Sequence, residues 1–402
     1  MDWEDANKVQ EGVYSIPKNW LNIEYYDALN VLYRVENALR MYVYVILKKH
    51  YKAKWDKQCI KVEENENGTI EAISKKRRSQ ARAFGYIGFS ATCPLAYLTS
   101  GELGRVITSD AYWSLFKEGF VTNKEIVKLK LEEMSSIRNE MAHFRAIKSD
   151  DVAVIRTNAK QLLTKIEKAL LSMLNTSNTV PTNTEEEWYR ELKAIRNEYC
   201  YLEFMESTDG QWINIIVKYG NALVQSNSYG EANNYRVLTV NVPAILSEYE
   251  KLRENTIYMS ERRPFSVLTE EDKKQNQEPF FLKEMGMVFA VENVRTEYKT
   301  ISEELTALVA KIKEESDLIK RDNLAAGKIV NLVWANATLR EGDKMAMIDT
   351  RAMLSPERET DPPEWWGTPP WVGGDFISDT KKFPWIPCEI SGGNRSSSGT
   401  RR

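Results

Sequence analysis

The hydrophobic pattern of this 402-residue chain changes at residues 175–187, where the segment "NTSNTVPTNTEEE" is polar and interrupted by Pro181. Before this segment, apolar residues recur at steps of three and four, which predicts amphipathic helices. After it, short runs rich in aromatic and β-branched residues predict strands. A pattern with the period of a helix and runs typical of strands predict different kinds of structure. We therefore expect two domains of different type, with the polar segment as their boundary.

We therefore predict an α+β protein overall. An all-α helical bundle is expected at residues 1–175, a linker at 176–187, an α+β domain at 188–390 and a disordered tail at 391–402. Helices are expected at 25–51, 122–144 and 150–174. Thr122 or Asn123 is expected to cap the second of these, and Thr99 or Ser100 a shorter helix. Strands are expected at 198–206, 212–220, 235–243 and 344–353.

Two features of the second half allow two interpretations each. Apolar residues between positions 291 and 312 step by three and four, which fits either a helix pair or a helix packed on a sheet. Four tryptophans lie in a segment rich in Pro and Gly. They favour either a hydrophobic clasp that packs this segment onto its own domain or a surface that recognises a protein or ligand. These residues are Trp365, Trp366, Trp371 and Trp385.

Composition limits the possible partners. The net charge is −3 and the pI about 5.8, so a nucleic-acid site would have to be a local basic patch. Four scattered cysteines and two histidines predict reduced thiols and no zinc site. The acidic, polar N-terminal segment does not resemble a secretory signal, and the longest apolar run is too short for a bilayer. We expect a cytoplasmic protein without metal, cofactor or membrane partner.

The segment "SSIRNEMAHFRAI" at residues 135–147 is the best candidate for chemistry. It contains Arg138, Asn139 and His143. Arginine fits a phosphate and stabilises developing negative charge, and histidine transfers protons near neutral pH. In an unbroken helix Arg138 and His143 would lie about 140° apart, so either the helix breaks near Ala142 or another surface completes the site.

These residue types could cleave RNA without a metal. A histidine base would assist the 2′-hydroxyl in attacking the adjacent phosphorus while arginine neutralises the phosphorane. The products would be a 2′,3′-cyclic phosphate and a 5′-hydroxyl, and DNA could not react in this way.

A second segment, "AIRNEYCY" at 194–201, repeats Ile-Arg-Asn-Glu but has Tyr201 where a histidine would fall. We interpret it as a chance recurrence before a strand. His50, the chain's other histidine, is interpreted as a cation at a helix C-terminus.

The stretch "SIRNEMAHF" resembles the signature of the HEPN superfamily, an arginine followed by four to six residues and a histidine. "RVENALRMYVYVILKK" is similar to a Glu-x-x-x-Arg pattern often seen there, with Glu36 and Arg40 in the matching positions. "AYLTSGELGRVITSDAYWSLFKEGF" (residues 96–120) resembles the middle of such domains. The resemblance covers roughly residues 20–175.

The resemblance implies a function. Arg138 and His143 would be the catalytic pair, with Asn139 as the polar residue beside them and Glu36 and Arg40 as supporting residues. HEPN domains typically form homodimers in which two motifs share one cleft. Many are metal-independent endoribonucleases in toxin–antitoxin, abortive-infection and CRISPR-associated systems, whereas others have lost catalysis and only bind RNA or nucleotides.

A basic cluster lies within this region, before the segment that contains Arg138 and His143. Lys75, Lys76, Arg77 and Arg78 form either a solvated loop or a contact for the RNA backbone.

The function that we expect is a metal-independent endoribonuclease acting on tRNA or mRNA as a toxin or anti-phage effector. The C-terminal domain would sense a protein or ligand trigger, bind an inhibitor or select the RNA. The alternative is a non-catalytic RNA- or protein-binding regulator built on a HEPN dimer. Nucleotide transfer or NTP hydrolysis is disfavoured because the sequence has no P-loop.

Overall fold

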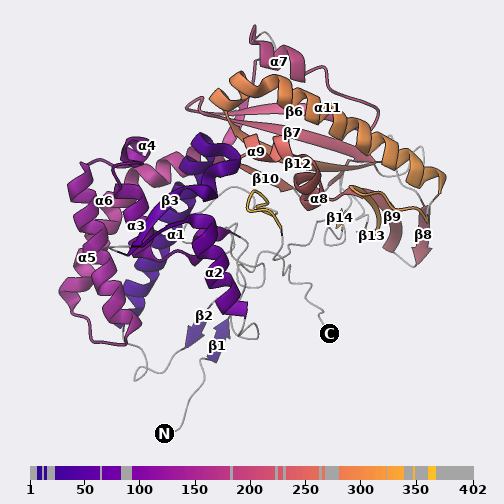
Figure 1. The fold of residues 1–402 in the computed structure, drawn as a ribbon. Helices are drawn as coiled ribbons and strands as arrows, with labels where there is room; N and C mark the ends of the chain where they lie inside the picture. The colour runs from indigo at the N-terminus through magenta and orange to yellow at the C-terminus, as the bar shows by residue number, and fades with distance from the viewer. Residues whose placement is uncertain are drawn as a thin grey trace. The chain divides into compact units, whose positions relative to one another are not determined.

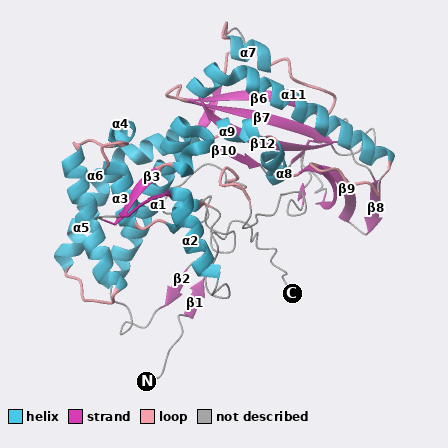
Figure 2. Cartoon of the chain, in the orientation of Figure 1, coloured by secondary structure: helices cyan, strands magenta, loops and turns pink. Residues whose placement is uncertain are grey.

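The computed structural model describes residues 7–10, 13–15, 23–63, 66–82, 93–181, 184–221, 225–229, 232–261, 265–267, 280–322, 324–338, 347–348 and 361–367. Helices and antiparallel sheets are both present, in agreement with the expected α+β class (Figures 1 and 2). The chain divides into two compact units, described separately below. The first contains Met1–Ile46, Cys59–Gly68 and Leu98–Leu170, and the second contains Leu47–Gln58, Thr69–Tyr97 and Leu171–Arg402.

The first unit is built from long helices. They are α1 (Ile23–Tyr51, up to Ile46 in this unit), α3 (Ser100–Thr108), α4 (Trp113–Phe116), α5 (Lys124–Ala142) and α6 (Ser149–Leu174). The Tyr25 hydroxyl, near the start of α1, donates a hydrogen bond to the carbonyl of Met141 in the last turn of α5. Leu39, further along α1, lines the same pocket as Leu131, nearer the start of α5. The two helices therefore run antiparallel. Arg34 of α1 pairs with Glu167 of α6 at 2.6 Å.

Two helix starts follow the predicted capping chemistry. Thr99 caps α3 in a reciprocal capping box: its hydroxyl accepts from the backbone N–H of Glu102, whose carboxylate accepts from the Thr99 backbone N–H at 2.8 Å. Asn123 caps α5 by accepting from the backbone N–H of Ile126 at 3.1 Å. Both caps lie within one residue of the predicted positions.

The first unit is not all helical. Strands β1 (Asn7–Gln10) and β2 (Val13–Ser15) pair antiparallel, and β3 (Cys59–Glu63) pairs with β4 (Glu66–Thr69). The expected all-α bundle is therefore wrong in this respect. Helix periodicity could not reveal such short pairs, because three to five residues are too few to establish a period.

The second unit contains two antiparallel sheets. The larger has the order β10-β12-β7-β6-β5, with β11 also paired to β12; its strands are β5 (Thr176–Thr179), β6 (Cys200–Ser207), β7 (Trp212–Asn221), β10 (Tyr258–Glu261), β11 (Phe265–Val267) and β12 (Phe280–Ala290). The smaller has the order β14-β13-β9-β8, with strands β8 (Gln225–Tyr229), β9 (Ala232–Val240), β13 (Val330–Thr338) and β14 (Met347–Ile348). The predicted strands at 198–206, 212–220, 235–243 and 344–353 thus correspond to β6, β7, β9 and β14.

Helix α11 (Val291–Arg321) covers the core of the larger sheet, as Figure 1 shows. Its Ile301, Leu305 and Leu308 are fully buried in the same apolar cluster as Met285 and Met287 of β12. The interpretation of the apolar seam as a sheet-packing helix is therefore confirmed, and the helix-pair interpretation is wrong. Shorter helices complete the unit: α2 (Ile70–Arg82), α7 (Glu187–Leu192), α8 (Val242–Glu248), α9 (Glu250–Asn255) and the 3₁₀ helices η1 (Lys52–Lys57) and η2 (Pro94–Tyr97).

The predicted linker at 176–187 is wrong. Residues 176–179 form β5, whose Thr176 pairs with Ser207 of β6, and Glu187 already begins α7. The predicted boundary at residue 175 lies close to the change of unit between Leu170 and Leu171, but residues 47–58 and 69–97 also belong to the second unit. Strand β5 lies at the edge of its sheet, and only its first residue, Thr176, is buried. Its other residues are exposed and polar, so its sequence resembles that of a loop. The predicted tail at 391–402 lies outside the described residues.

The clasp interpretation is confirmed for two of the tryptophans. Trp365 and Trp366 are buried, and the Trp366 ring stacks on Tyr258 of β10 with centroids 4.2 Å apart. The backbone N–H of Met259 donates to the carbonyl of Glu364 at 2.7 Å. The segment 361–367 therefore packs beside β10 of its own unit, while Trp371 and Trp385 lie outside the described residues.

Candidate functional site

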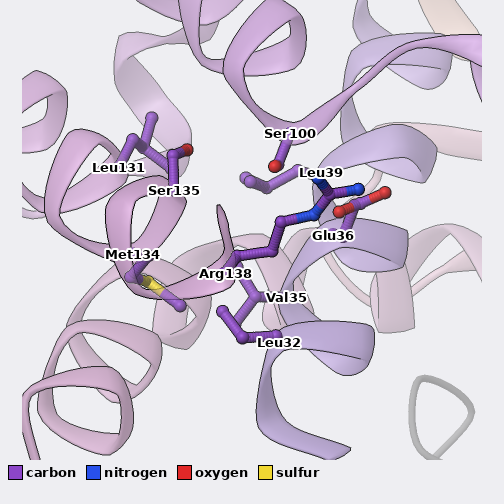
Figure 3. A pocket seen from close by; sticks show the side chains of 9 residues that line it. All are labelled: Leu32, Val35, Glu36, Leu39, Ser100, Leu131, Met134, Ser135 and Arg138. Atoms are coloured by element: carbon purple, nitrogen blue, oxygen red, sulfur yellow. The ribbon is translucent and has the colours of Figure 1, made fainter. Parts of the chain in front are cut away.

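Arg138 lies on α5 and lines a small pocket in the first unit. The cavity has a free volume of about 20 Å³, room for a water-sized group but not for a nucleotide. Figure 3 shows the guanidinium of Arg138 pointing toward the carboxylate of Glu36 on α1. The pocket walls come from α1, α3 and α5: Leu32, Val35, Glu36, Leu39, Ser100, Leu131, Met134, Ser135 and Arg138.

Glu36 is held by a second arginine. It forms an ion pair with Arg40, which also donates to the Asn37 side chain at 3.1 Å and to the carbonyl of Leu98 at 3.2 Å. Counting Arg138, the group carries two positive charges and one negative charge, so it keeps a net attraction for an anion. The structure thus brings together Arg138, Glu36 and Arg40, three of the predicted site residues.

Arg138 itself has few partners. Among the described residues its guanidinium makes one hydrogen bond, from Nη1 to the amide oxygen of Asn139 at 3.4 Å, and no ion pair. Asn139 is exposed, whereas Arg138 is half-buried. An arginine whose charge is not neutralised by a carboxylate is available to a ligand phosphate.

His143 follows the last residue of α5. The helix ends at Ala142, and the backbone N–H of His143 donates to the carbonyl of Asn139 at 3.2 Å. Of the two alternatives drawn from the sequence, the first is observed, because α5 ends at Ala142. The imidazole is exposed, does not line the Arg138 pocket and has no hydrogen bond or ion pair to another described residue.

The basic cluster at residues 75–78 lies on helix α2, so the loop interpretation is wrong. Arg77 donates to the carbonyl of Tyr97 at 2.6 Å, and the guanidinium of Arg78 lies 5.4 Å from the Tyr97 ring centroid. Lys75 and Lys76 are exposed. The two arginines thus contact Tyr97 of η2 and are half-buried, whereas the two lysines of this cluster are exposed.

The second Ile-Arg-Asn-Glu segment forms a turn before β6. The Asn197 side chain accepts from the backbone N–H groups of Tyr199 at 2.8 Å and Cys200 at 2.9 Å. Its amide group also donates to the carbonyl of Val309 at 2.7 Å. As expected, this copy precedes a strand, β6.

His50, the chain's other histidine, differs from its expected role. Burial and the neighbouring Lys49 lower its pKa. His50 lies in the last turn of α1, as predicted, but this shift favours the neutral imidazole over the expected cation.

Several pocket residues were missed from the sequence. No local pattern marks Ser100, Met134 and Ser135 as pocket residues. Leu32, Val35 and Leu39 lie three or four residues from Glu36 or from each other on α1, and this spacing could have placed them on the same face of the helix.

No group of three or more potential metal-ligating side chains occurs among the described residues. No described helix has a stretch long and apolar enough to cross a membrane.

Comparisons with protein-family models, with curated proteins and with solved structures found no match.

Proposed function

We propose that the first unit is a HEPN-like domain and that the protein is a metal-independent endoribonuclease. The observation that supports this most is the pair formed by Arg138, which has no carboxylate partner among the described residues, and His143, which is exposed at the end of the same helix. A guanidinium that forms no ion pair with a described residue and an exposed imidazole that likewise has no described side-chain partner are the groups that a phosphate-cleaving site requires.

The proposed chemistry assigns one role to each side chain. His143 acts as general base or acid on the 2′-hydroxyl, Arg138 stabilises the phosphorane, and Asn139 orients Arg138 through the hydrogen bond between them. The ion pair between Glu36 and Arg40 supports the wall of the pocket that faces Arg138.

We propose that a homodimer completes the site. Three large side chains on α1 face solvent: Tyr26 is 54% exposed, Leu29 56% and Tyr33 38%. Leu29 and Glu36 are seven residues apart and therefore only about 20° apart around the helix. The exposed apolar stripe thus borders the Arg138 pocket, where a second copy would cover it and bring a second His143 to the cleft.

A toxin or anti-phage role follows from the same resemblance. The second unit, with its larger sheet and clasp, would then sense a protein or ligand trigger, bind an inhibitor or select the RNA, whether tRNA or mRNA. Lys75 and Lys76 are the exposed members of the basic cluster that could contact an RNA backbone.

One observation favours a non-catalytic regulator instead. The carboxylate of Glu36 lies where a phosphate bound to Arg138 would approach (Figure 3), and it would compete with that phosphate for the guanidinium. In this alternative the same dimer would bind RNA or a protein without cutting.

The test is a cleavage assay with purified protein, total RNA or tRNA, and EDTA. The nuclease proposal expects cleavage in EDTA, products with 2′,3′-cyclic phosphate and 5′-hydroxyl ends, and no cleavage of DNA of the same sequence. RNA that is shifted on a gel but left intact would establish the regulator instead. Cleavage that requires added divalent metal would contradict the proposed mechanism.

A further inference from the structure

Phe144, the residue after His143, is placed unusually. Its side chain is 91% exposed, and its backbone φ of 55° lies in the left-handed region. Glycine is the residue that usually ends a helix in this conformation, because a Cβ atom is strained there. Neither core packing nor backbone preference explains a phenylalanine at this position, and such outliers point to a function.

The backbone that carries Phe144 is firmly held. Its N–H donates to the carbonyl of Met141 at 2.9 Å, and the N–H of Arg145 donates to the carbonyl of Glu140 at 3.0 Å. The Arg145 side chain also pairs with the Glu140 carboxylate at 2.9 Å. The Tyr25 hydroxyl of α1 donates to the same Met141 carbonyl. The ring is therefore exposed on a fixed turn, which lowers the entropic cost of binding a ligand.

The surroundings of Phe144 along the chain are basic. His143, Arg145 and Lys148 are exposed, and no acidic residue lies between positions 143 and 148, although Arg145 pairs with Glu140. An aromatic ring interleaved with cationic side chains is the pattern with which proteins bind single-stranded nucleic acid, because bases stack on the ring and phosphates meet the charges. A protein partner would instead need a contiguous apolar patch, and the immediate neighbours of Phe144 in the chain are His143 and Arg145.

We propose that Phe144 stacks on an unpaired base of the RNA, next to the phosphate that Arg138 and His143 engage. This inference rests on the proposed function. Consecutive Cα atoms lie only ~3.8 Å apart, so a base on Phe144 belongs to a nucleotide at or beside the phosphate that His143 contacts. Stacking needs a splayed base, so the substrate class is single-stranded RNA or a loop, with little preference for base identity.

The experiment measures binding of a labelled single-stranded RNA by fluorescence anisotropy, with His143→Ala in every protein to prevent cleavage. Phe144→Leu keeps an exposed apolar side chain but removes the aromatic face, and we expect it to weaken binding about tenfold or more. Phe144→Trp should retain the affinity. Tyr201→Leu, at a 43% exposed aromatic in the second unit, is the matched control and should change nothing.

A second RNA, with an abasic site in place of the stacked nucleotide, separates stacking from other contacts of the ring. It should bind the protein that retains Phe144 more weakly than the intact RNA does. The Phe144→Leu protein should bind the abasic and the intact RNA equally, because it has no aromatic face for the missing base. Equal losses in both proteins would contradict stacking on Phe144.

The remaining outcomes separate this inference from the nuclease proposal. Equal affinities of the Phe144 and Phe144→Leu proteins would overturn the inference and leave the nuclease proposal standing. A loss of affinity that only follows loss of the dimer in sedimentation would assign Phe144 to the contact between two copies and overturn it too. Binding that depends on Phe144, with no RNA cleavage by the protein that retains His143, would support stacking and contradict the nuclease. Absence of any RNA binding would overturn both.

Discussion

Lys48 and Glu364 form an ion pair in the interior of the second unit, although 316 positions separate them in the chain. Their side chains are 1% and 5% exposed. Burial lowers the pKa of Lys48, and the charge of Glu364 opposes that shift. The pair therefore fastens the clasp segment 361–367 to the end of α1 through two charges that must both be present.

The first prediction concerns this pair. Glu364→Gln should lower the free energy of unfolding by about 3–5 kcal/mol, because it leaves the Lys48 charge buried without a partner. The double variant Lys48→Met/Glu364→Leu should recover most of this loss, since no charge remains to be desolvated. Urea unfolding measures both. A Glu364→Gln protein as stable as the wild type would show that the pair is not buried in solution.

The second prediction concerns catalysis. His143→Ala and Arg138→Ala should each reduce RNA cleavage in EDTA by at least about 100-fold, because each removes a proton-transfer or charge-stabilising group. Both side chains lie at or near the surface, so thermal unfolding should be unchanged. Arg196→Ala, the arginine of the second Ile-Arg-Asn-Glu segment, is the matched control. Cleavage that survives in both variants would exclude this motif as the active site.

The third prediction concerns the dimer. Leu29→Glu and Tyr33→Glu should each convert the proposed dimer to a monomer, because a charge would enter the proposed apolar contact. Sedimentation velocity measures the mass, and RNA cleavage should fall together with it. Leu318→Glu changes a leucine on α11 that is 42% exposed, and it should leave the mass unchanged. A wild-type protein that is fully active as a monomer would contradict the shared cleft.

The fourth prediction concerns pH. Glu315 accepts from the backbone N–H groups of Ile329 at 2.9 Å and Val330 at 2.8 Å. Burial acts to raise the pKa of this carboxyl, but the backbone donors and Lys311 outweigh it, so the pKa is lowered. Because the pKa of Glu315 is lower in the folded than in the unfolded protein, its carboxylate contributes its full stabilisation at pH values above the unfolded pKa of about 4.3. This contribution is lost as the pH falls through the folded pKa.

Glu315→Gln should therefore destabilise the protein at neutral pH by about 1–3 kcal/mol and flatten the acid limb of its stability profile. Glu314→Gln, at the exposed neighbouring position, should do neither. Unfolding midpoints measured from pH 7 to pH 3 provide the test, and parallel acid limbs for the wild type and Glu315→Gln would rule out the role of Glu315.

Long elements were predictable because their hydrophobic periods are local. The helices at 122–144 and 150–174 agree with α5 and α6 within two residues at each end, and the strand at 212–220 agrees with β7. Leu29 and Leu129 follow the apolar period of their helices but are each 56% exposed. Periodicity gives the apolar side of a helix but not whether a neighbour in the same chain covers it.

The sequence by itself determined the α+β class, the caps at Thr99 and Asn123, and the chemical types of Arg138, Asn139 and His143, because these depend on residues close together in the chain. Only the tertiary structure decided which carboxylate faces Arg138, which strand lies beside the clasp, and that residues 176–179 join a sheet rather than a linker. Those outcomes depend on residues distant in sequence. Lys48 and Glu364 form an ion pair, and Glu36 and Arg138 line one pocket, and no local pattern encodes this packing.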